Sequence, residues 1–407
     1  MFGFKKEIKI DTSEDKIQKL LTRNIEEIFV KETLEKKLKS GKQLRIKLGF
    51  DPTGPTTHIG RAITLRKMRE FQDLGHKLVF LVGNFTAQIG DPSDKLEKRP
   101  TLSPDEIEKN LKDYIDIAGK IIDISKIEVV YNADWLSKLT FTEVAKLADS
   151  FTVAQMTNRR NFKDRLEKGD EVSLREFLYP LMQGYDSVVT EADVEIGGFD
   201  QLFNLKAGRT VQKFYNKPVQ DVITTVMLEG TDGRKMSTSW GNVINITDDP
   251  KDMFGKIMTL NDELIPKYFM ACTDISLEEH QKVVDDLKDE KNNPKDIKMR
   301  LAKEIVSIYH GKKEADKAED NFIKIFSEGL KPDEIKEIKT KKGSKLVSVL
   351  VDNNIIESNS EFRRLVTGGA VKNVDTDIKI EDTNYLIESS VTLKIGKRRF
   401  LKIEVEA

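Results

Sequence analysis

Two short segments carry residues that suit the binding of a nucleotide. In GFDPTGPTTHIGRA, His58 and Gly60 stand where a strand-like run gives way to a helical one. Free backbone N–H groups and the helix dipole make such a point an anion site, and glycine lets a bulky ligand approach the backbone. Far along the chain, GTDGRKMSTSWGN follows Arg234 and Lys235 with three small hydroxyl side chains. A glycine-flanked basic loop of this kind could fold over phosphates.

Each of these segments has a plainer interpretation when taken alone. The first could be an ordinary strand-to-helix turn with an incidental histidine, and the second a basic surface loop. Their order and setting together favour one shared site for a triphosphate. A P-loop ATPase is not indicated, because no GxxxxGK followed by Ser or Thr occurs in the chain.

A third polar set lies in YPLMQGYDS. Its members Tyr179, Gln183 and Asp186 are spaced by four and three residues, so they project from one face of a helix. A convergent polar face of this kind predicts a site for a small polar molecule. Without the flanking motifs, Asp186 would be interpreted as a carboxylate on a helix surface.

The elements around the first segment form a βαβ unit. The pattern from Gln43 to Gly49 is strand-like, and apolar residues then recur at helical spacing until Gly75. The run from Lys77 to Val82 predicts the next strand, and the two strands should be parallel. Ligands of parallel sheets bind at the carboxyl ends of the strands. Three later segments are also predicted strands: 127–131, 194–197 and 219–227.

Three domains are expected in a chain of 407 residues. Residues 1–240 predict a doubly wound α/β catalytic domain, with a helix opened by the capping box Ser103-Pro104-Asp105-Glu106. Residues 241–338 are helical, charged on one face and poor in strand formers. Residues 339–407 form a small α+β domain with a helix near 358–365 and a closing strand pair around KIGKRRFLKIEVEA.

Bulk composition excludes several classes of protein. The 68 Lys plus Arg nearly balance the 69 Asp plus Glu, so contacts with nucleic acid must come from local patches. Cys272 is the single cysteine, which excludes an internal disulfide and a cysteine-cluster zinc site. The chain shows no secretory leader and no run long and apolar enough to cross a bilayer, so a cytoplasmic location is expected.

These motifs together resemble those of class I aminoacyl-tRNA synthetases. HIGR is similar to the HIGH signature of that class, and KMSTS is similar to KMSKS. The segments GFDPT, IGDPSDK, YPLMQGYDS and GGFDQLFNL resemble the bacterial tyrosyl-tRNA synthetases in particular. The final module resembles their RNA-binding domain, which is named after ribosomal protein S-four. The resemblance covers nearly the whole chain and implies a class I Rossmann-type domain, a helical domain on the anticodon side and a small RNA-binding domain.

The resemblance also implies roles for individual residues. The first step, attack of a carboxylate on the α-phosphate of ATP, needs alignment and charge stabilisation on pyrophosphate. Residues implied in catalysis are Thr53, His58, Arg61, Lys95, Arg99 and Lys235. Those implied in ATP binding are Asp51, His58, Gly60, Gly198, Asp200, Lys235, Met236, Ser237 and Ser239. Those implied in tyrosine binding are Lys47, Gly49, Asp91, Asn132, Tyr179, Gln183, Asp186 and Gln201.

The remaining expectations concern partners. By the resemblance, Asp186 accepts the phenolic hydroxyl, magnesium accompanies ATP, the partner is tRNA(Tyr) and the enzyme is a homodimer. No tightly bound cofactor and no metal site in the protein are expected. A basic cluster in the carboxyl module predicts RNA contacts and consists of Arg363, Arg364, Lys372, Lys397, Arg398 and Arg399.

Four positions depart from the family pattern and keep alternatives open. The second histidine of the signature is Arg61, and the second lysine of the loop motif is Thr238, whose charge Arg234 would have to replace. Lys47 stands where many relatives have a phenol-contacting tyrosine, and it either pairs with Asp186 or donates to the substrate. Phe199 replaces a small hydroxyl residue. The alternatives are tryptophan as the substrate, or a synthetase-derived RNA-binding protein without aminoacylation.

Overall fold

The computed structural model describes residues 9–52, 57–91, 103–237, 240–326, 336–356, 358–376, 378–396 and 399–406. The chain divides into two compact units, Met1–Gly311 and Lys312–Ala407. The helices between residues 250 and 310 belong to the first unit, so three separate domains stay a prediction. Within the described ranges, every helix is too short or too polar to cross a membrane.

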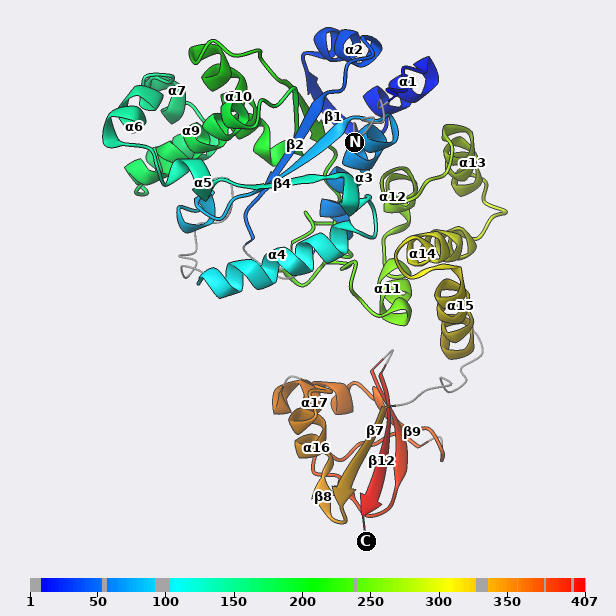
Figure 1. The fold of residues 1–407 in the computed structure, drawn as a ribbon. Coiled ribbons are helices and arrows are strands. Elements are labelled where there is room, and N and C mark those ends of the chain that lie inside the picture. Colours follow the sequence, from blue (N-terminus) through cyan, green and yellow to red (C-terminus); the bar gives the residue numbers. More distant parts are fainter. Residues whose placement is uncertain are drawn as a thin grey trace, which may run out of the picture. The chain divides into compact units, whose positions relative to one another are not determined.

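A six-stranded sheet forms the centre of the first unit (Figure 1). Its strand order is β1-β6-β5-β2-β3-β4, and every neighbouring pair is parallel except β1 with β6. The strands are β1 (Ile25–Phe29), β2 (Arg45–Phe50), β3 (Lys77–Val82), β4 (Glu128–Tyr131), β5 (Val194–Gly198) and β6 (Asp221–Thr225). The predicted doubly wound parallel sheet is therefore confirmed, and five of its strands were expected from the sequence.

The strand order reverses between β2 and β5. From β2 the chain proceeds outward to β3 and β4, whereas β5 and β6 lie on the other side of β2. Parallel sheets bind ligands outside the carboxyl ends of the strands at such a switch point. The strand ends that meet there are Phe50 and Gly198, which adjoin predicted site residues.

Helices cover both faces of this sheet (Figure 1). The capping box predicted at Ser103 and Glu106 is formed at the start of the fourth helix. The helices of the first unit are α1 (Glu14–Thr22), α2 (Lys31–Lys39), α3 (Ile59–Asp73), α4 (Pro104–Ala118), α5 (Ala133–Leu136), α6 (Phe141–Ala148), α7 (Val153–Thr157), α8 (Arg160–Lys168), α9 (Leu174–Val189), α10 (Leu202–Phe214), α11 (Pro250–Ile257), α12 (Ile265–Cys272), α13 (Leu277–Lys288) and α14 (Pro294–His310). Short 3-10 turns lie at η1 (Thr86–Gln88), η2 (Ile124–Lys126), η3 (Phe199–Gln201) and η5 (Asp262–Leu264).

Strand β1 was not predicted from the sequence. Its five residues, IEEIF, contain two adjacent glutamates and match neither strict strand alternation nor a helical pattern. It forms because it pairs with β6, where Phe29 lies opposite Val222. Such a strand depends on a partner far along the chain, which local patterns do not reveal.

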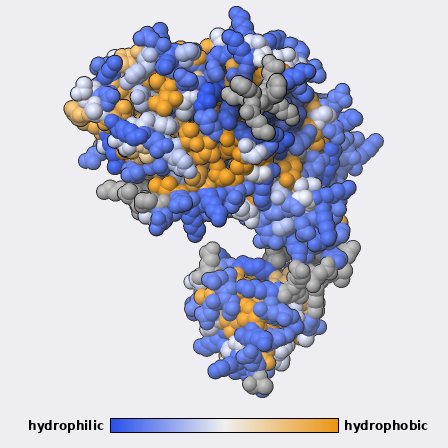
Figure 2. All heavy atoms as spheres, viewed as in Figure 1, coloured by the Kyte–Doolittle hydropathy of each residue, from blue (hydrophilic) through white to orange (hydrophobic). Residues whose placement is uncertain are grey.

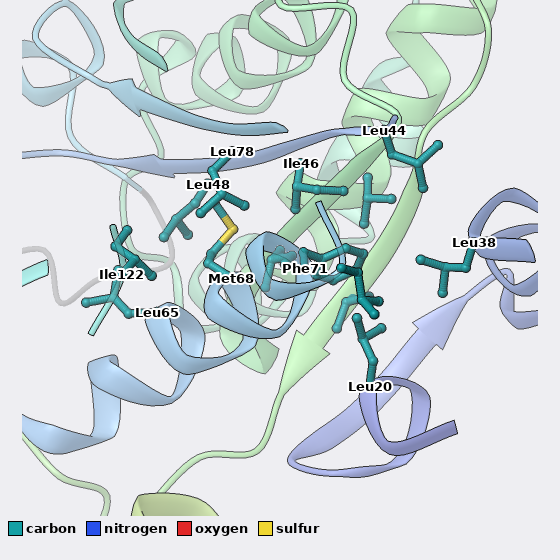
Figure 3. Packing of buried hydrophobic residues seen from close by; sticks show 14 of the residues in the cluster. Leu20, Leu38, Leu44, Ile46, Leu48, Leu65, Met68, Phe71, Leu78 and Ile122 are labelled. Atoms are coloured by element: carbon teal, nitrogen blue, oxygen red, sulfur yellow. The ribbon is translucent and has the colours of Figure 1, made fainter. Parts of the chain in front are cut away.

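The main core lies between the sheet and the helices on one face (Figure 3). Leu65, Met68 and Phe71 project from α3 at helical spacing and pack against Ile46 and Leu78 of the strands. This packing fixes the start of α3, and therefore the turn that carries His58, relative to the end of β2.

The second unit contains α15 (Lys312–Phe326), α16 (Leu346–Asp352) and α17 (Asn359–Thr367). Its four-stranded sheet has the order β7-β12-β11-β9, and a two-stranded sheet pairs β10 with β8. The strands are β7 (Lys336–Lys341), β8 (Ser344–Lys345), β9 (Val371–Asn373), β10 (Leu386–Ile387), β11 (Val391–Ile395) and β12 (Arg399–Glu406). The predicted helix near 358–365 and the closing strand pair are confirmed as α17 and as β11 with β12.

Candidate active site

The two signature segments meet in the fold. Backbone hydrogen bonds join the first segment to the residues that directly follow the second: the N–H of Ile59 donates to the carbonyl of Ile244 at 2.9 Å, and the N–H of Ile246 donates to the carbonyl of Thr57 at 3.0 Å. A Cβ atom placed on Gly60 would lie 3.0 Å from His58 Nδ1 and 3.4 Å from Met236 Sδ. The HIGR turn and the KMSTS loop therefore form one site, as their order along the chain suggested.

His58 is a neutral residue in this site. Burial, together with the positive charges of Arg61 and Lys235, lowers the pKa of His58 to about 4. At neutral pH the ring therefore carries one proton and donates one hydrogen bond. Positive charge at this turn comes from Arg61 and Lys235 instead of the histidine.

Asp51 lies at the carboxyl end of β2, within the amino-acid side of the site. Its Oδ1 accepts from Thr86 Oγ1 at 2.8 Å, and its Oδ2 accepts from Tyr179 Oη at 2.9 Å. Burial raises the pKa of Asp51 to about 7, the two hydrogen bonds oppose this rise, and the charges of Asp91 and Asp186 add to it. Burial also raises the pKa of Tyr179 well above its usual value, so this tyrosine is a neutral donor.

Gly83 makes room for Asp51 and was missed from the sequence. A Cβ atom at Gly83 would lie 1.9 Å from Asp51 Oδ1, which is well inside van der Waals contact. By contrast, a Cβ atom at Gly49 would meet only Leu81 Cδ2 at 3.6 Å, among the described residues. Gly49 is exposed although it lies within β2, so the strand opens to solvent at that point.

The KMSTS loop is organised by Asn242, which sequence reasoning also missed. Its side-chain oxygen accepts from the Ser237 N–H at 2.8 Å, and its amide donates to Asp232 at 2.7 Å. Lys235 Nζ lies 3.1 Å from Asp200 Oδ2, beside Gly198 and the exposed Phe199 of η3. The dipeptide Gly-Asn after the motif is the signal that could have identified this residue.

Arg234, the expected substitute for the missing second lysine, is held elsewhere. Its guanidinium forms an ion pair with Asp232 at 2.5 Å and lies over the Trp240 ring, 4.7 Å from the centroid. Thr238 itself lies outside the described residues. Compensation by Arg234 would require it to leave Asp232.

Two predicted tyrosine-binding residues, Asp91 and Gln201, meet at a second acidic point. Asp91 Oδ2 accepts from Gln201 Nε2 at 2.7 Å, and Asp91 Oδ1 accepts from Asn204 Nδ2 at 3.4 Å. Arg159, which is buried and stacks on Phe203, approaches the same oxygen at 3.9 Å. Asn204 could have been found from its spacing of three after Gln201, but no sequence signal pointed to Arg159.

Asp186 is buried, not a surface carboxylate. Its Oδ1 accepts from the indole Nε1 of Trp135 at 2.8 Å, and its Oδ2 accepts from Asn132 Nδ2 at 3.3 Å. Burial raises the pKa of Asp186 to about 6, and the charge of Lys47 is the largest opposing influence. Trp135 was not identified from the sequence, whereas Asn132 was.

Lys47 is fully buried and forms an ion pair with Glu195, 3.0 Å from Nζ to Oε1. The alternative in which Lys47 pairs with Asp186 is therefore wrong. The physical reason is the sheet register, because Lys47 of β2 and Glu195 of β5 are opposite one another in the parallel ladder. Gln183 donates to the same carboxylate at 3.1 Å.

Several predicted residues belong to the second unit or lie outside the described residues. In the second unit, Arg363 and Arg364 are exposed on α17, Lys372 is half-buried on β9, and Arg399 pairs with Glu361 at 2.8 Å. The predicted residues outside the described ranges are Thr53, Lys95, Arg99, Ser239, Lys397 and Arg398. Their roles stay predictions.

The chain is similar to curated proteins over most of its length. The chain is 46% identical over 403 residues to the tyrosine–tRNA ligase of Carboxydothermus hydrogenoformans, covering 95% of this chain and 97% of that one. It is 43% identical over 395 residues to that of Thermotoga maritima, covering 96% and 98%.

Solved structures show a similar fold at lower identity. A truncated mitochondrial tyrosyl-tRNA synthetase from Aspergillus nidulans matches with a TM-score of 0.62 and 23% identity, over 76% of this chain and 94% of that one. The synthetase from Archaeoglobus fulgidus, solved with L-tyrosine, matches with a TM-score of 0.59 and 20% identity, over 75% and 99%. Since residues 39–327 also match the family described as tRNA synthetases class I (W and Y), the chain belongs to that family.

Proposed function

We propose that the chain activates L-tyrosine with ATP and then transfers it to the 3′ end of tRNA(Tyr). The observation that carries this proposal is the meeting of three features at the β2–β5 switch point: the HIGR turn, the KMSTS loop and the buried Asp186. The chain is a tyrosine–tRNA ligase of class I, in agreement with relatives 43% and 46% identical over nearly its whole length.

The phosphate side of the site works by position and charge. In the first step a carboxylate oxygen of tyrosine bonds to the α-phosphorus while the bond to pyrophosphate breaks, so negative charge grows on the leaving group. Lys235 and Arg61 place positive charge beside neutral His58, and by family resemblance Thr53, Lys95 and Arg99 join them. Preorganised donors of this kind stabilise the transition state without moving a proton.

Magnesium enters this scheme as part of the substrate MgATP. Among the described residues, no group of three or more His, Cys, Asp or Glu side chains gathers in a way that could hold a metal ion. The triphosphate supplies oxygen ligands of the kind that Mg²⁺ prefers. Lys235 must leave Asp200 for the pyrophosphate, which frees that carboxylate for the ribose.

The amino-acid side holds the two polar ends of tyrosine. Asp91, Tyr179, Gln183 and Gln201 surround the position proposed for the ammonium group, and Asp186 accepts the phenolic O–H. A buried site built to pair a hydroxyl rejects an analogue that lacks it, an effect for which tyrosyl-tRNA synthetases are the usual illustration. Tryptophan is not favoured as the substrate, because the relatives at 43% and 46% identity are tyrosine–tRNA ligases. Simple RNA binding without catalysis is not favoured either, given the ligase relatives.

A homodimer is part of this proposal, and exposed apolar residues on the first unit support it. Phe141 is 90% exposed, Val153 73% and Leu174 79%, and they begin α6, α7 and α9. Figure 2 shows hydrophobic residues at the edge of the unit that carries α6. Exposed apolar surface of this extent is typical of a protein interface. Sedimentation should show a dimer for the wild type and a monomer for Phe141→Glu, whereas Lys163→Glu on the exposed face of α8 should leave the dimer intact.

The second unit is proposed to bind the tRNA through exposed Arg363 and Arg364. A cytoplasmic location stays a prediction from the sequence.

The complete reaction is tested by transfer of labelled tyrosine to tRNA(Tyr), with labelled tryptophan and tRNA(Trp) offered in parallel. Only tyrosine on tRNA(Tyr) should become acid-precipitable. Charging of tRNA(Trp) with tryptophan, or of neither tRNA, would contradict the proposal.

A further inference from the structure

A closed polar network lies between β2, β5 and α9. Its centre is the ion pair of Lys47 and Glu195, and both side chains are 0% exposed. Glu195 has no role in the function proposed above. Two buried charges lose their hydration, so such a pair persists only when its other hydrogen bonds are well made.

The network satisfies both charged groups. Lys47 Nζ also donates to Ser187 Oγ at 2.7 Å and to the carbonyl of Gln183 at 3.1 Å, which uses all three of its N–H bonds. Glu195 Oε1 accepts from Lys47 and Gln183, while Oε2 accepts from Ser187 Oγ at 3.1 Å and from Gln220 Nε2 at 2.5 Å. The pair is therefore held in one geometry from β2, β5, α9 and the residue just before β6.

The first consequence concerns the amide of Gln183. A carboxylate only accepts hydrogen bonds, so the amide must turn its NH₂ group toward Glu195, where the distance is 3.1 Å. The amide oxygen is then the end left for other partners. A substrate ammonium group is a donor, and a partly exposed Gln183 held this way presents the matching acceptor.

The second consequence concerns the charge of Asp186. Its charged or titratable neighbours are Lys47 from β2, Glu195 from β5, Asp51 beyond the end of β2 and Tyr179 on α9. Its remaining partners, Trp135 and Asn132, are neutral donors. Lys47 is the only cation in this set, and its effect is offset in part by Glu195.

We propose that Glu195 is a positioning residue for both ends of the amino-acid pocket: it orients Gln183 for the ammonium group and, through Lys47, sets the charge state in which Asp186 meets the phenol. A phenolic O–H donates well to a carboxylate, whereas a protonated Asp186 competes as a donor. Discrimination between tyrosine and phenylalanine therefore depends on this ion pair. The inference rests on the proposed function, since it assigns a role in that same pocket.

The test is the ratio of kcat/KM for tyrosine over phenylalanine in pyrophosphate exchange, measured from pH 5 to 8. The ratio cancels effects at the ammonium end, including the titration of Asp51. Wild type should lose discrimination as the pH falls through about 6. Lys47→Met should move this midpoint up by about one pH unit, which lowers discrimination about fivefold at pH 6.

Removing the negative partner of the ion pair separates an effect of charge on Asp186 from an effect of packing. Glu195→Gln should move the midpoint down, because Lys47 then acts on Asp186 without its counter-charge. It should also raise KM for both amino acids several-fold, since a glutamine at 195 no longer fixes the amide of Gln183. The double variant, Lys47→Met with Glu195→Gln, should bring the midpoint back toward that of the wild type.

Lys37→Met is the matched control. It removes the partner of the buried Asp221, 2.9 Å away, at the amino end of β6, and should lower the melting temperature with the midpoint unchanged. If Lys47→Met fails to fold, the inference is tested by the direction in which Glu195→Gln shifts the pH midpoint of discrimination: a downward shift supports it and an upward shift contradicts it. Equal midpoints in all variants, or shifts of the same sign in the two single variants, would overturn the inference while leaving the proposed function intact. Absence of tyrosine-dependent exchange in the wild type would instead reject the proposed function.

Discussion

The two ends of the active site are built differently. Around Asp186, Lys47 and Glu195 the side chains are buried, and their polar atoms are paired from several elements. Around the KMSTS loop the charged side chains of Arg234 and Lys235 are exposed and engaged with Asp232 and Asp200. The amino-acid end is therefore preorganised, whereas the phosphate end must exchange partners when ATP arrives. In the proposed function, the first region supplies specificity and the second supplies charge to the transition state.

Asp186→Ala tests the amino-acid end and should have the largest effect. It removes the acceptor for the phenol and leaves the Trp135 and Asn132 donors unpaired, so kcat/KM for tyrosine should fall several hundredfold, about 3–4 kcal/mol. Steady-state exchange assays measure this directly. Asp193→Ala, at the opposite end of β5, is the control. An equal loss of kcat/KM for tyrosine in Asp193→Ala would show that the effect is not specific to the amino-acid end of the site.

Lys235→Ala tests the phosphate end. Loss of one fixed charge that acts on departing pyrophosphate should lower kcat of activation about a hundredfold. KM for tyrosine should stay unchanged, because the lysine is remote from the amino-acid pocket in this account. Lys267→Ala removes a lysine of similar exposure that pairs with Glu229 and should have little effect on kcat. A rise in KM for tyrosine in Lys235→Ala would break the separation of the two ends.

Alanine variants of two glycines separate effects on packing inside the protein from effects on the space left for the substrate. Gly49→Ala adds a methyl group in ordinary van der Waals contact with Leu81, so it should preserve the melting temperature but raise KM for tyrosine about tenfold. Gly83→Ala places a methyl group against Asp51 and should destabilise the protein by about 1–3 kcal/mol. Calorimetry and exchange assays on both variants check this. Similar melting temperatures for the two would show that Gly83 has no packing role.

The smallest effect concerns pH and Asp51. Its pKa in the folded protein, about 7, lies above its unfolded value, so its contribution to stability is present below the unfolded pKa and is lost as the pH rises through 7. Asp51→Asn should therefore melt higher relative to wild type at pH 8 than at pH 5. Calorimetry at both values measures this difference, and an equal difference at the two pH values would mean that Asp51 stays ionised throughout.

Sequence patterns predicted most strands of the central sheet and several of the site residues that its neighbouring elements carry. Five strands, the capped helix α4 and the polar face of α9 follow from local periodicity and capping residues. Strand β1 and the Lys47–Glu195 pair could not be predicted, because both depend on which strands become neighbours. Trp135 and Gly83 were missed for a similar reason, since their roles come from contacts with side chains far along the chain.

The phosphate end of the active site was easier to predict from sequence motifs than the amino-acid end. His58, Gly60 and Lys235 are recognisable because nucleotide chemistry requires their residue types at fixed spacing. Buried partners such as Glu195 vary with their surroundings, and the departure at Lys47 becomes intelligible only together with Glu195. A residue that breaks a family pattern is therefore best interpreted with its partner in the fold.

Amino-acid-dependent exchange of labelled pyrophosphate into ATP tests the central claim most directly. Tyrosine, phenylalanine and tryptophan are offered separately to the wild type and to Asp186→Ala. The account predicts rapid exchange with tyrosine alone, and its loss in the variant. Equal exchange with phenylalanine or tryptophan, or undiminished exchange with tyrosine in Asp186→Ala, would contradict the assignment of the β2–β5 switch point as a tyrosine-activating site.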